Sequence, residues 1–165
     1  MSEPVPQPEK ETLTYERYGV AARELAQTIA DAGFMPDAIV GIARGGLLLA
    51  GSIAYALDIK NVHMVNVEFY TGEGKTLQAP VVLPPYLDKH HLADLRLLVV
   101  DDVADSGETL KLVDQLCRDV ATEVRTAVLY EKPRSVVRTD FFWRQTDLWI
   151  NFPWSTDPPI DIKAS

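Results

Sequence analysis

The chain has 165 residues, a length that suits one domain and is short for two. Its 16 Lys and Arg side chains against 24 Asp and Glu give a formal net charge of −8, which disfavours a sequence-independent nucleic-acid binder. Hydrophobic residues make up 47%, which excludes a wholly disordered chain, and the single cysteine, Cys117, excludes an internal disulfide framework. We therefore expect one globular domain without a nucleic-acid partner, in a reducing compartment.

Neither a membrane span nor a signal peptide is expected. The most apolar stretch, residues 47–57, has 11 residues and contains Gly51 and Ser52, whereas a spanning helix needs about 20. The N-terminus is acidic and holds three prolines, without the basic start or apolar core of a signal peptide. We expect a disordered lead-in over 1–11, a single domain over 12–165, and a cytoplasmic protein without a membrane partner.

Hydrophobic spacing predicts alternating helices and strands along the chain. Thr14 is a candidate N-cap for a helix that begins at Tyr15, carries apolar residues at three- and four-residue spacing, and ends at Gly33. In chain order, the further expected elements are a strand over 37–42, a helix over 46–57, and strands over 62–69 and 95–100, then a helix over 108–120 and a strand over 124–130. This alternation predicts a parallel sheet with helices on both faces, and ligands beyond the carboxyl ends of its strands.

Two stretches do not follow this alternation. Residues 70–94 are punctuated by glycine and proline and are too long for a plain connection, which favours a lid, a hairpin or a disordered loop. No other metal-ligating motif accompanies His90 and His91 there, so we interpret them as surface residues. After Lys132 the sequence becomes irregular and aromatic, and it predicts no further regular element.

The segment that follows the 95–100 strand carries the most chemistry. Four carboxylates fall within eight residues: Asp101, Asp102, Asp105 and Glu108. Like charges this close are unfavourable unless cations or ordered donors offset them. The next helix opens with Ser106, Gly107 and Thr109, whose backbone N–H groups and hydroxyls suit an anion. A ligand that carries ribose, phosphate and magnesium would satisfy both halves of this segment.

The acidic segment also allows two other interpretations. Each of its residues, taken singly, also fits a solvated acidic turn with a helix cap. A phosphoacceptor receiver domain would place its acids on separate strands, with an early acidic pair. That domain is disfavoured because the 37–42 strand runs into Ala43 and Arg44 without an acidic pair.

Residues 99–109 resemble the 5-phosphoribosyl 1-diphosphate (PRPP) signature of type I phosphoribosyltransferases. In that family the acidic pair binds ribose hydroxyls directly or through Mg²⁺, the next Asp lies near the base as the proposed general base, and the loop holds the 5′-phosphate. The resemblance therefore implies a catalytic Asp105 and a magnesium ligand at Asp102, together with Asp101. The implied PRPP-binding residues here are Asp101, Asp102, Ala104, Asp105, Ser106, Gly107, Glu108 and Thr109. Ser106 replaces the commoner Thr and keeps the hydroxyl.

The turn GIARGG over residues 41–46 is neither a dinucleotide-binding motif nor a P-loop. Alone it fits a tight strand-to-helix turn. Beside the acidic segment it resembles the diphosphate loop of purine phosphoribosyltransferases, in which Arg44 and the backbone at Gly45 would hold the diphosphate. The resemblance also implies a cis peptide bond between Ala43 and Arg44.

Residues 68–75 resemble the mobile lid of the family, which closes over PRPP and excludes water. The resemblance places this lid over about 70–94. Lys75 would then reach the diphosphate, although a surface lysine in a loop is an equally good interpretation.

Lys132 and the aromatic segment over 147–154 resemble the base-binding hood of xanthine-guanine and hypoxanthine-guanine phosphoribosyltransferases. The family's lysine, here Lys132, donates to the purine O6, its aromatic residue, here Trp149, stacks on the ring, and the backbone of Ile150 contacts the base edge. Taken alone, Lys132 fits an exposed lysine and Trp149 fits a small core. The resemblance places the hood over about 132–159.

Together these resemblances imply an α/β, type I phosphoribosyltransferase fold: a twisted, mainly parallel sheet flanked by helices, with a small C-terminal hood. They imply transfer of the 5-phosphoribosyl group from PRPP to a 6-oxopurine, giving a purine 5′-mononucleotide and diphosphate in purine salvage, with Mg²⁺ as cofactor. A non-catalytic regulator that senses PRPP or nucleotides, and a transferase for another acceptor such as a pyrimidine, remain alternatives. Because family members commonly form dimers or tetramers, we also expect a homo-oligomer.

Overall fold

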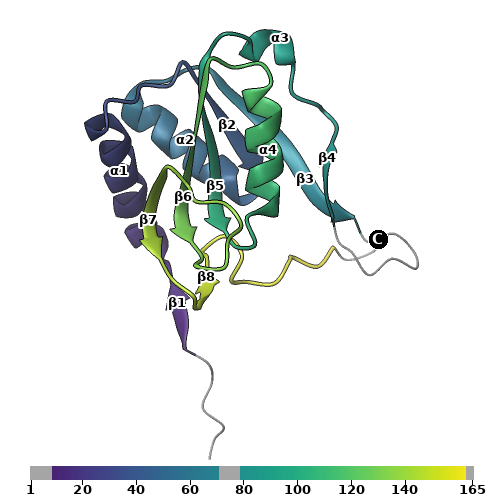
Figure 1. Cartoon of the computed structure of the whole chain (residues 1–165). Helices are drawn as coiled ribbons and strands as arrows, with labels where there is room; N and C mark the ends of the chain where they lie inside the picture. The colour runs from purple at the N-terminus through teal and green to yellow at the C-terminus, as the bar shows by residue number, and fades with distance from the viewer. Residues whose placement is uncertain (1–8, 71–78, 163–165) are drawn as a thin grey trace, which may run out of the picture.

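The computed structural model describes residues 9–70 and 79–162 (Figure 1). In chain order the elements are β1 (Lys10–Thr12), α1 (Tyr15–Asp31), β2 (Ala38–Ala43), α2 (Gly45–Leu57), β3 (Val62–Tyr70), β4 (Ala79–Leu83), α3 (Lys89–Leu92), β5 (Arg96–Ala104), α4 (Glu108–Arg118), β6 (Glu123–Glu131), β7 (Phe141–Gln145) and β8 (Trp149–Asn151). Within the described residues, no helix has the length and apolar character needed to cross a membrane.

The main sheet has the strand order β4-β3-β2-β5-β6-β7, and the β3–β4 pair is its antiparallel pair. The other neighbours run parallel. Helices α1 and α2 cover one face and α4 covers the other (Figure 1). Alternate residues of β5 serve both cores, because Leu98 and Val100 point toward α1 and α2 while Leu97 and Val99 point toward α4. The predicted fold class is confirmed.

Helix α1 begins and ends close to its predicted limits. The Thr14 side chain accepts a hydrogen bond from the Arg17 backbone N–H at 3.2 Å, so it caps the helix as expected. The apolar stripe that includes Leu25 and Ile29 is buried in the core. Gly33 follows the helix with a φ of 71°, a conformation that favours glycine.

The structure differs from the prediction at several element ends. Strand β5 continues beyond Val100 and carries the acidic pair within the sheet, because β6 pairs with it as far as Ala104. After Lys132 the chain forms β7 at the sheet edge and β8, neither of which was predicted. The lead-in expected over 1–11 is wrong at its end, because Lys10 pairs with Trp149 in a separate parallel pair, β1–β8.

The start of α2 packs directly against the end of β5. A Cβ atom built on Gly45 would lie 1.9 Å from Oδ2 of Asp102, and one on Gly46 would lie 2.5 Å from the Val100 carbonyl oxygen. A side chain at Gly46 would therefore displace the backbone of β5, and one at Gly45 would displace the Asp102 carboxylate. The peptide between Ala43 and Arg44, just before this contact, is cis, as expected. The arginine turn (residues 41–46) and the acidic pair (Asp101 and Asp102), far apart in the sequence, are therefore in direct contact.

Replacement of Gly45 by Ala should destabilise the fold by about 1–3 kcal/mol, because the new methyl group overlaps the Asp102 carboxylate. Gly51 in the same helix is the matched control, since a Cβ there meets nothing within 4 Å. Gly51→Ala should stabilise the fold by about 0.5–1 kcal/mol. Urea unfolding of both variants measures the two effects, and equal stability of the two would contradict the close contact at Gly45.

Cys117 should be unreactive in the folded protein. Its side chain is fully buried in the core between the sheet and α4. Burial, with a smaller effect from nearby Asp114, raises the pKa of the thiol to about 12. Almost no thiolate is then present at about pH 8, so iodoacetamide should modify Cys117 only after denaturation. Mass spectrometry of native and denatured samples measures this difference, and rapid native labelling would contradict it.

Candidate active site

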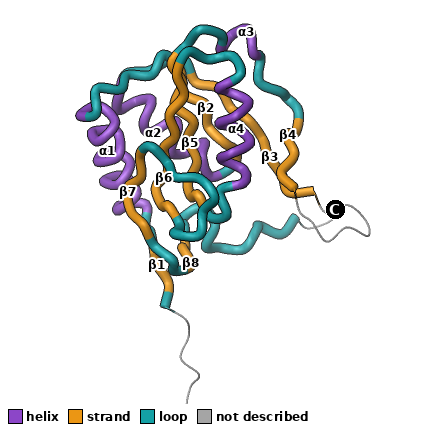
Figure 2. Tube along the Cα trace, in the orientation of Figure 1, coloured by secondary structure: helices purple, strands orange, loops and turns teal. Residues whose placement is uncertain are grey.

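Three of the predicted site segments meet at one edge of the sheet. Strands β2, β5 and β6 are neighbours and parallel, so their carboxyl ends lie together. The arginine turn (residues 41–46) joins β2 to α2, the acidic loop (residues 101–108) spans the end of β5 and the start of α4, and the segment 132–140, here called the hood loop, follows β6. Figure 2 shows the loops after β5 and β6 at the same end of the molecule. This edge is where ligands bind in parallel α/β sheets.

The acidic pair forms a partly buried anionic centre. The Asp102 backbone N–H donates to Oδ1 of Asp101 at 2.8 Å. Burial, and next the adjacent Asp102 carboxylate, raise the pKa of Asp101 well above its ordinary value. Burial also raises the pKa of Asp102, while hydrogen bonding to Asp101 and to the Trp154 side chain opposes that rise. Two desolvated carboxylates side by side favour either a shared proton or a bound cation.

The acidic pair could supply at most part of a metal's ligands. In residues 9–70 and 79–162, no group of three His, Cys, Asp or Glu side chains is arranged to hold a metal ion. Mg²⁺ is typically bound by one or two carboxylates, with water and substrate phosphates filling its other positions. The donor set at Asp101 and Asp102 therefore fits Mg²⁺ that arrives with a phosphorylated ligand.

Two cavities meet at Asp102. One, of about 200 Å³, is enclosed by Phe69 of β3 and by residues 101–107, Thr109 and Leu110. The other, of about 860 Å³, lies against Arg44, Gly45 and the C-terminal segment that includes Trp154. Asp102 lines both cavities, so a ligand that extended from one to the other would pass this carboxylate.

The smaller cavity includes the start of α4. Gly107 is the N-cap of this helix with a φ of 81°, and it has no side chain to cap the N–H groups of the first turn. A Cβ at Gly107 would lie 2.3 Å from Oγ of Ser135 in the hood loop, so the position requires glycine both for its backbone and for space. A helix N-terminus beside hydroxyls, here Ser106 and Thr109, is suited to a phosphate.

The hood loop is fastened to the acidic loop. The Lys132 backbone N–H donates to the Ala104 carbonyl at 3.0 Å, and the Val136 N–H donates to the Ser106 carbonyl at 2.8 Å. Between these bonds, Nε of Arg134 lies 2.8 Å from Oδ1 of Asp105, and Nη2 contacts the same oxygen. Arg134 was not among the predicted site residues. Only its position two residues after Lys132 could have drawn attention to it.

Lys132 is buried rather than exposed. Its side chain donates to the Leu148 carbonyl, and the residue is only 6% exposed. Burial lowers the pKa of this lysine, while Asp105 and Asp147 act in the opposite direction. The ammonium is therefore held at the junction of the acidic loop and the segment that leads into β8.

Trp149 follows Leu148 directly and is 70% exposed, which excludes the small-core interpretation. The next residue, Ile150, is buried. The core role belongs instead to Trp154, whose ring stacks on Phe152 at a centroid distance of 5.0 Å. The Leu148–Lys132 bond brings Lys132 close to the backbone of Trp149 and Ile150, so the structure brings together the three residues expected to bind a base. Lys75 lies outside the described residues.

Glu131, a buried carboxylate that was not among the predicted site residues, anchors the hood loop. Glu131 accepts hydrogen bonds from the N–H and hydroxyl of Thr139, both at 2.7 Å, and from Gln145 at 2.9 Å and Arg138 at 3.3 Å. Burial raises the pKa of Glu131, but these hydrogen bonds outweigh burial and hold the pKa below its ordinary value. An ionised Glu131 thus ties both ends of the loop to β7.

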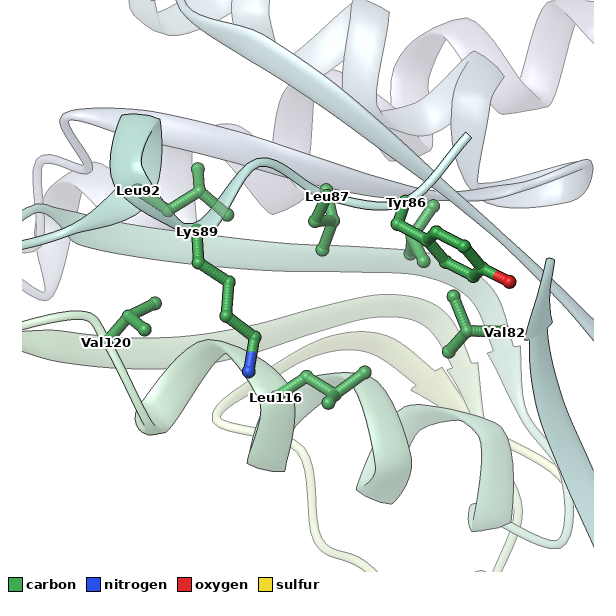
Figure 3. A pocket seen from close by; sticks show the side chains of 8 residues that line it. Val82, Tyr86, Leu87, Lys89, Leu92, Leu116 and Val120 are labelled. Carbon is green, nitrogen blue, oxygen red and sulfur yellow. The ribbon is translucent and has the colours of Figure 1, made fainter. Parts of the chain in front are cut away.

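A separate apolar cavity of about 250 Å³ lies on the α4 side of the sheet. Figure 3 shows Val82 and Leu87 facing Leu116 of α4 across it, with Lys89 and Tyr86 also in its lining. None of the predicted site residues lines it. His90 and His91 on nearby α3 are exposed, as expected.

Comparison with known proteins agrees with this arrangement. The family model described as phosphoribosyl transferase domain matches residues 12–161. The chain is 32% identical over 149 residues to the xanthine-guanine phosphoribosyltransferase of Gluconobacter oxydans, a match that covers 89% of this chain and 85% of the relative. It is 38% identical over 134 residues to the Ruegeria enzyme of the same name, with 74% and 73% covered.

Solved structures show the same fold. The purine phosphoribosyltransferase from Pyrococcus horikoshii superposes with a TM-score of 0.79 at 35% identity, and the match covers 93% of this chain and 99% of that one. A hypothetical protein from Neisseria gonorrhoeae with bound ppGpp gives a TM-score of 0.78 at 26% identity, with 92% of each chain covered. With its sheet order and clustered loops, the chain belongs to the phosphoribosyltransferase family.

Proposed function

We propose that this protein transfers the 5-phosphoribosyl group of PRPP to a 6-oxopurine base, giving a purine 5′-mononucleotide and diphosphate. The observation that carries the proposal is the acidic loop fixed between two partners. Gly45 of the arginine turn contacts Asp102 on one side, and the hood loop with Lys132 is bonded to Ala104 on the other. The names of the xanthine-guanine relatives support the same reaction.

In this proposal PRPP lies along the two cavities that meet at Asp102. Its 5′-phosphate would occupy the start of α4, and its diphosphate would lie toward Arg44 and Gly45 in the larger cavity. The residues proposed to contact PRPP are Arg44, Gly45, Asp101, Asp102, Ala104, Asp105, Ser106, Gly107, Glu108 and Thr109. Contact by Lys75 and closure of a lid remain predictions.

Mg²⁺ is the proposed cofactor, held by Asp102 with Asp101 and by oxygens of PRPP. When bound, it neutralises charge on the diphosphate leaving group. The chain itself contributes two adjacent carboxylates whose mutual repulsion and burial favour such a cation.

The base would lie under the hood. Trp149 offers an exposed aromatic face for stacking, and the Ile150 backbone would contact the base edge. Lys132 has only donors, so it suits the O6 acceptor of a 6-oxopurine and disfavours the 6-amino group of adenine. To reach O6, its ammonium must either leave the Leu148 carbonyl that it now contacts or donate to both acceptors.

In the proposed reaction, the bond between C1′ and the diphosphate oxygen breaks and both electrons leave with diphosphate. Positive charge then develops on the ribose, as it does in glycoside hydrolysis. A purine nitrogen forms the new bond to C1′, and Asp105 accepts the proton that this nitrogen loses. The adjacent carboxylates stabilise the developing charge.

The Neisseria structure with bound ppGpp favours a second candidate function. A chain of the same fold could bind PRPP or a guanine nucleotide and act as a non-catalytic regulator. The cavities at Asp102 would serve such a ligand equally well, so only turnover separates the two functions. For either function, homo-oligomer formation remains part of the proposal.

A nucleotide-forming assay with Mg²⁺ and PRPP tests the proposal, with guanine, xanthine, hypoxanthine, adenine and uracil offered in parallel. We expect product from one or more of the three 6-oxopurines and none from adenine or uracil, because Lys132 selects an acceptor at position 6. Chelation of Mg²⁺ should abolish turnover. Product from uracil alone would establish a pyrimidine acceptor, and tight PRPP binding without any product would establish the regulator.

Asp105→Asn should lower kcat by about 10²–10⁴-fold, the usual contribution of a general base. The fold should be retained, because the Asp105 side chain is half exposed. Asp31→Asn, an exposed change at the end of α1, is the matched control and should leave kcat unchanged. Steady-state rates and thermal melting of both variants provide the measurement. Full activity of Asp105→Asn would refute its catalytic assignment.

A further inference from the structure

The hood loop and the acidic loop run side by side in a fixed register. Backbone bonds join Lys132 to Ala104 and Val136 to Ser106. Asp105 lies between the two bonded positions of one loop, and Arg134 lies between those of the other. The backbone register therefore places the Asp105 and Arg134 side chains next to each other.

Arg134 contacts only one of the two carboxylate oxygens of Asp105. Both Nε and Nη2 of Arg134 reach Oδ1 of Asp105, so the second carboxylate oxygen, Oδ2, is left for another partner. Within residues 9–70 and 79–162, Arg134 is the only cation in ion-pair contact with any of the four carboxylates of the 101–108 segment. The guanidinium thus fixes the orientation of one carboxylate and leaves the acidic pair without a cation of its own.

Asp105 and Arg134 both affect the ionisation of Lys132. Asp105 favours its charged form, and Arg134 disfavours it. Yet its ammonium donates to the Leu148 carbonyl rather than to Asp105. A carboxylate already paired with Arg134 attracts Lys132 less strongly than a bare one would. Removing Arg134 would therefore give Lys132 a competing partner away from the hood.

We propose that Arg134 is a positioning residue for base binding and proton transfer. It holds Oδ1 of Asp105, aims Oδ2 at the purine N–H, and keeps the Lys132 ammonium available for the purine O6. This inference rests on the proposed function, since it assigns Arg134 a role through the two residues that the function assigns to the base.

A purely structural role for this ion pair is the alternative. The Arg134 and Asp105 side chains are 71% and 50% exposed, and exposed pairs contribute little to folding stability. Arg96 and Asp37 form a pair of the same kind, with Nε and Nη2 of Arg96 on the carboxylate and exposures of 45% and 39%. That pair lies at the opposite end of β5, so Arg96→Gln is the matched control.

The experiment compares Arg134→Gln with Arg96→Gln in the nucleotide-forming assay, with KM measured separately for base and for PRPP. For Arg134→Gln we expect kcat/KM for the base to fall about tenfold, the value of one charge-assisted hydrogen bond. KM for the base should rise while KM for PRPP stays unchanged. Arg96→Gln should leave all three constants unchanged. In an Asp105→Asn background, Arg134→Gln should produce a much smaller further loss, because the two residues act together.

The inference is overturned if wild-type enzyme turns over and Arg134→Gln behaves like Arg96→Gln. Equal rises in both KM values, or losses that add fully in the double variant, would also overturn it. Absence of turnover by the wild-type protein is a different failure, because it rejects the proposed function and the inference together. Arg134→Lys keeps the charge with a different donor geometry, and partial recovery of the base KM would support positioning.

Discussion

The contact between α2 and β5 is the constraint on which the candidate site depends. Two consecutive glycines let the start of a helix touch a strand that carries two carboxylates, at distances where no side chain fits. Because the helix covers it, the acidic pair is desolvated, and because the pair is desolvated, it needs a cation or proton. Among the described residues no cation contacts the pair, which agrees with the proposal that Mg²⁺ binds there together with PRPP.

An acidic chain that binds an anionic ligand needs positive potential at the positions that the anionic groups of the ligand occupy. The net charge is −8, and a phosphorylated sugar would be repelled by most of the surface. In the proposed binding mode, attraction comes from Arg44 at one end, the N-terminus of α4 at the other, and Mg²⁺ between them. This division suits PRPP, whose 5′-phosphate and 1-diphosphate lie at opposite ends of a ribose. It also explains why the overall charge says little about the ligand.

Local sequence patterns predicted the alternating helices and strands, and with them the edge of the sheet at which the site loops lie together. The Thr14 cap, the apolar stripe of α1 and the alternation of helices and strands are short-range features, and the structure confirms them. Strand β5 was cut short at Val100 because acidic residues are depleted in strands, whereas pairing with β6 overrides that preference. Strand β8 was missed because its partner, β1, lies near the other end of the chain, and β7 because its residues, FFWRQ, do not alternate between apolar and polar side chains. The proposed role of Arg134 could not be predicted either, because its contact with Asp105 depends on the register between two loops.

Burial of Lys132 bears directly on how a base would be chosen. An ammonium held in a partly apolar place is costly without an acceptor, and the Leu148 carbonyl now meets part of that need. A base with an acceptor at position 6 could take over that task, whereas a 6-amino group would leave the charge poorly satisfied. Selection at position 2 of the ring would rest on the backbone at Ile150, because its side chain is turned into the core. In the proposed function, discrimination between a 6-oxopurine and adenine would therefore depend on the Lys132 side chain, and preference among the 6-oxopurines would depend on main-chain contacts.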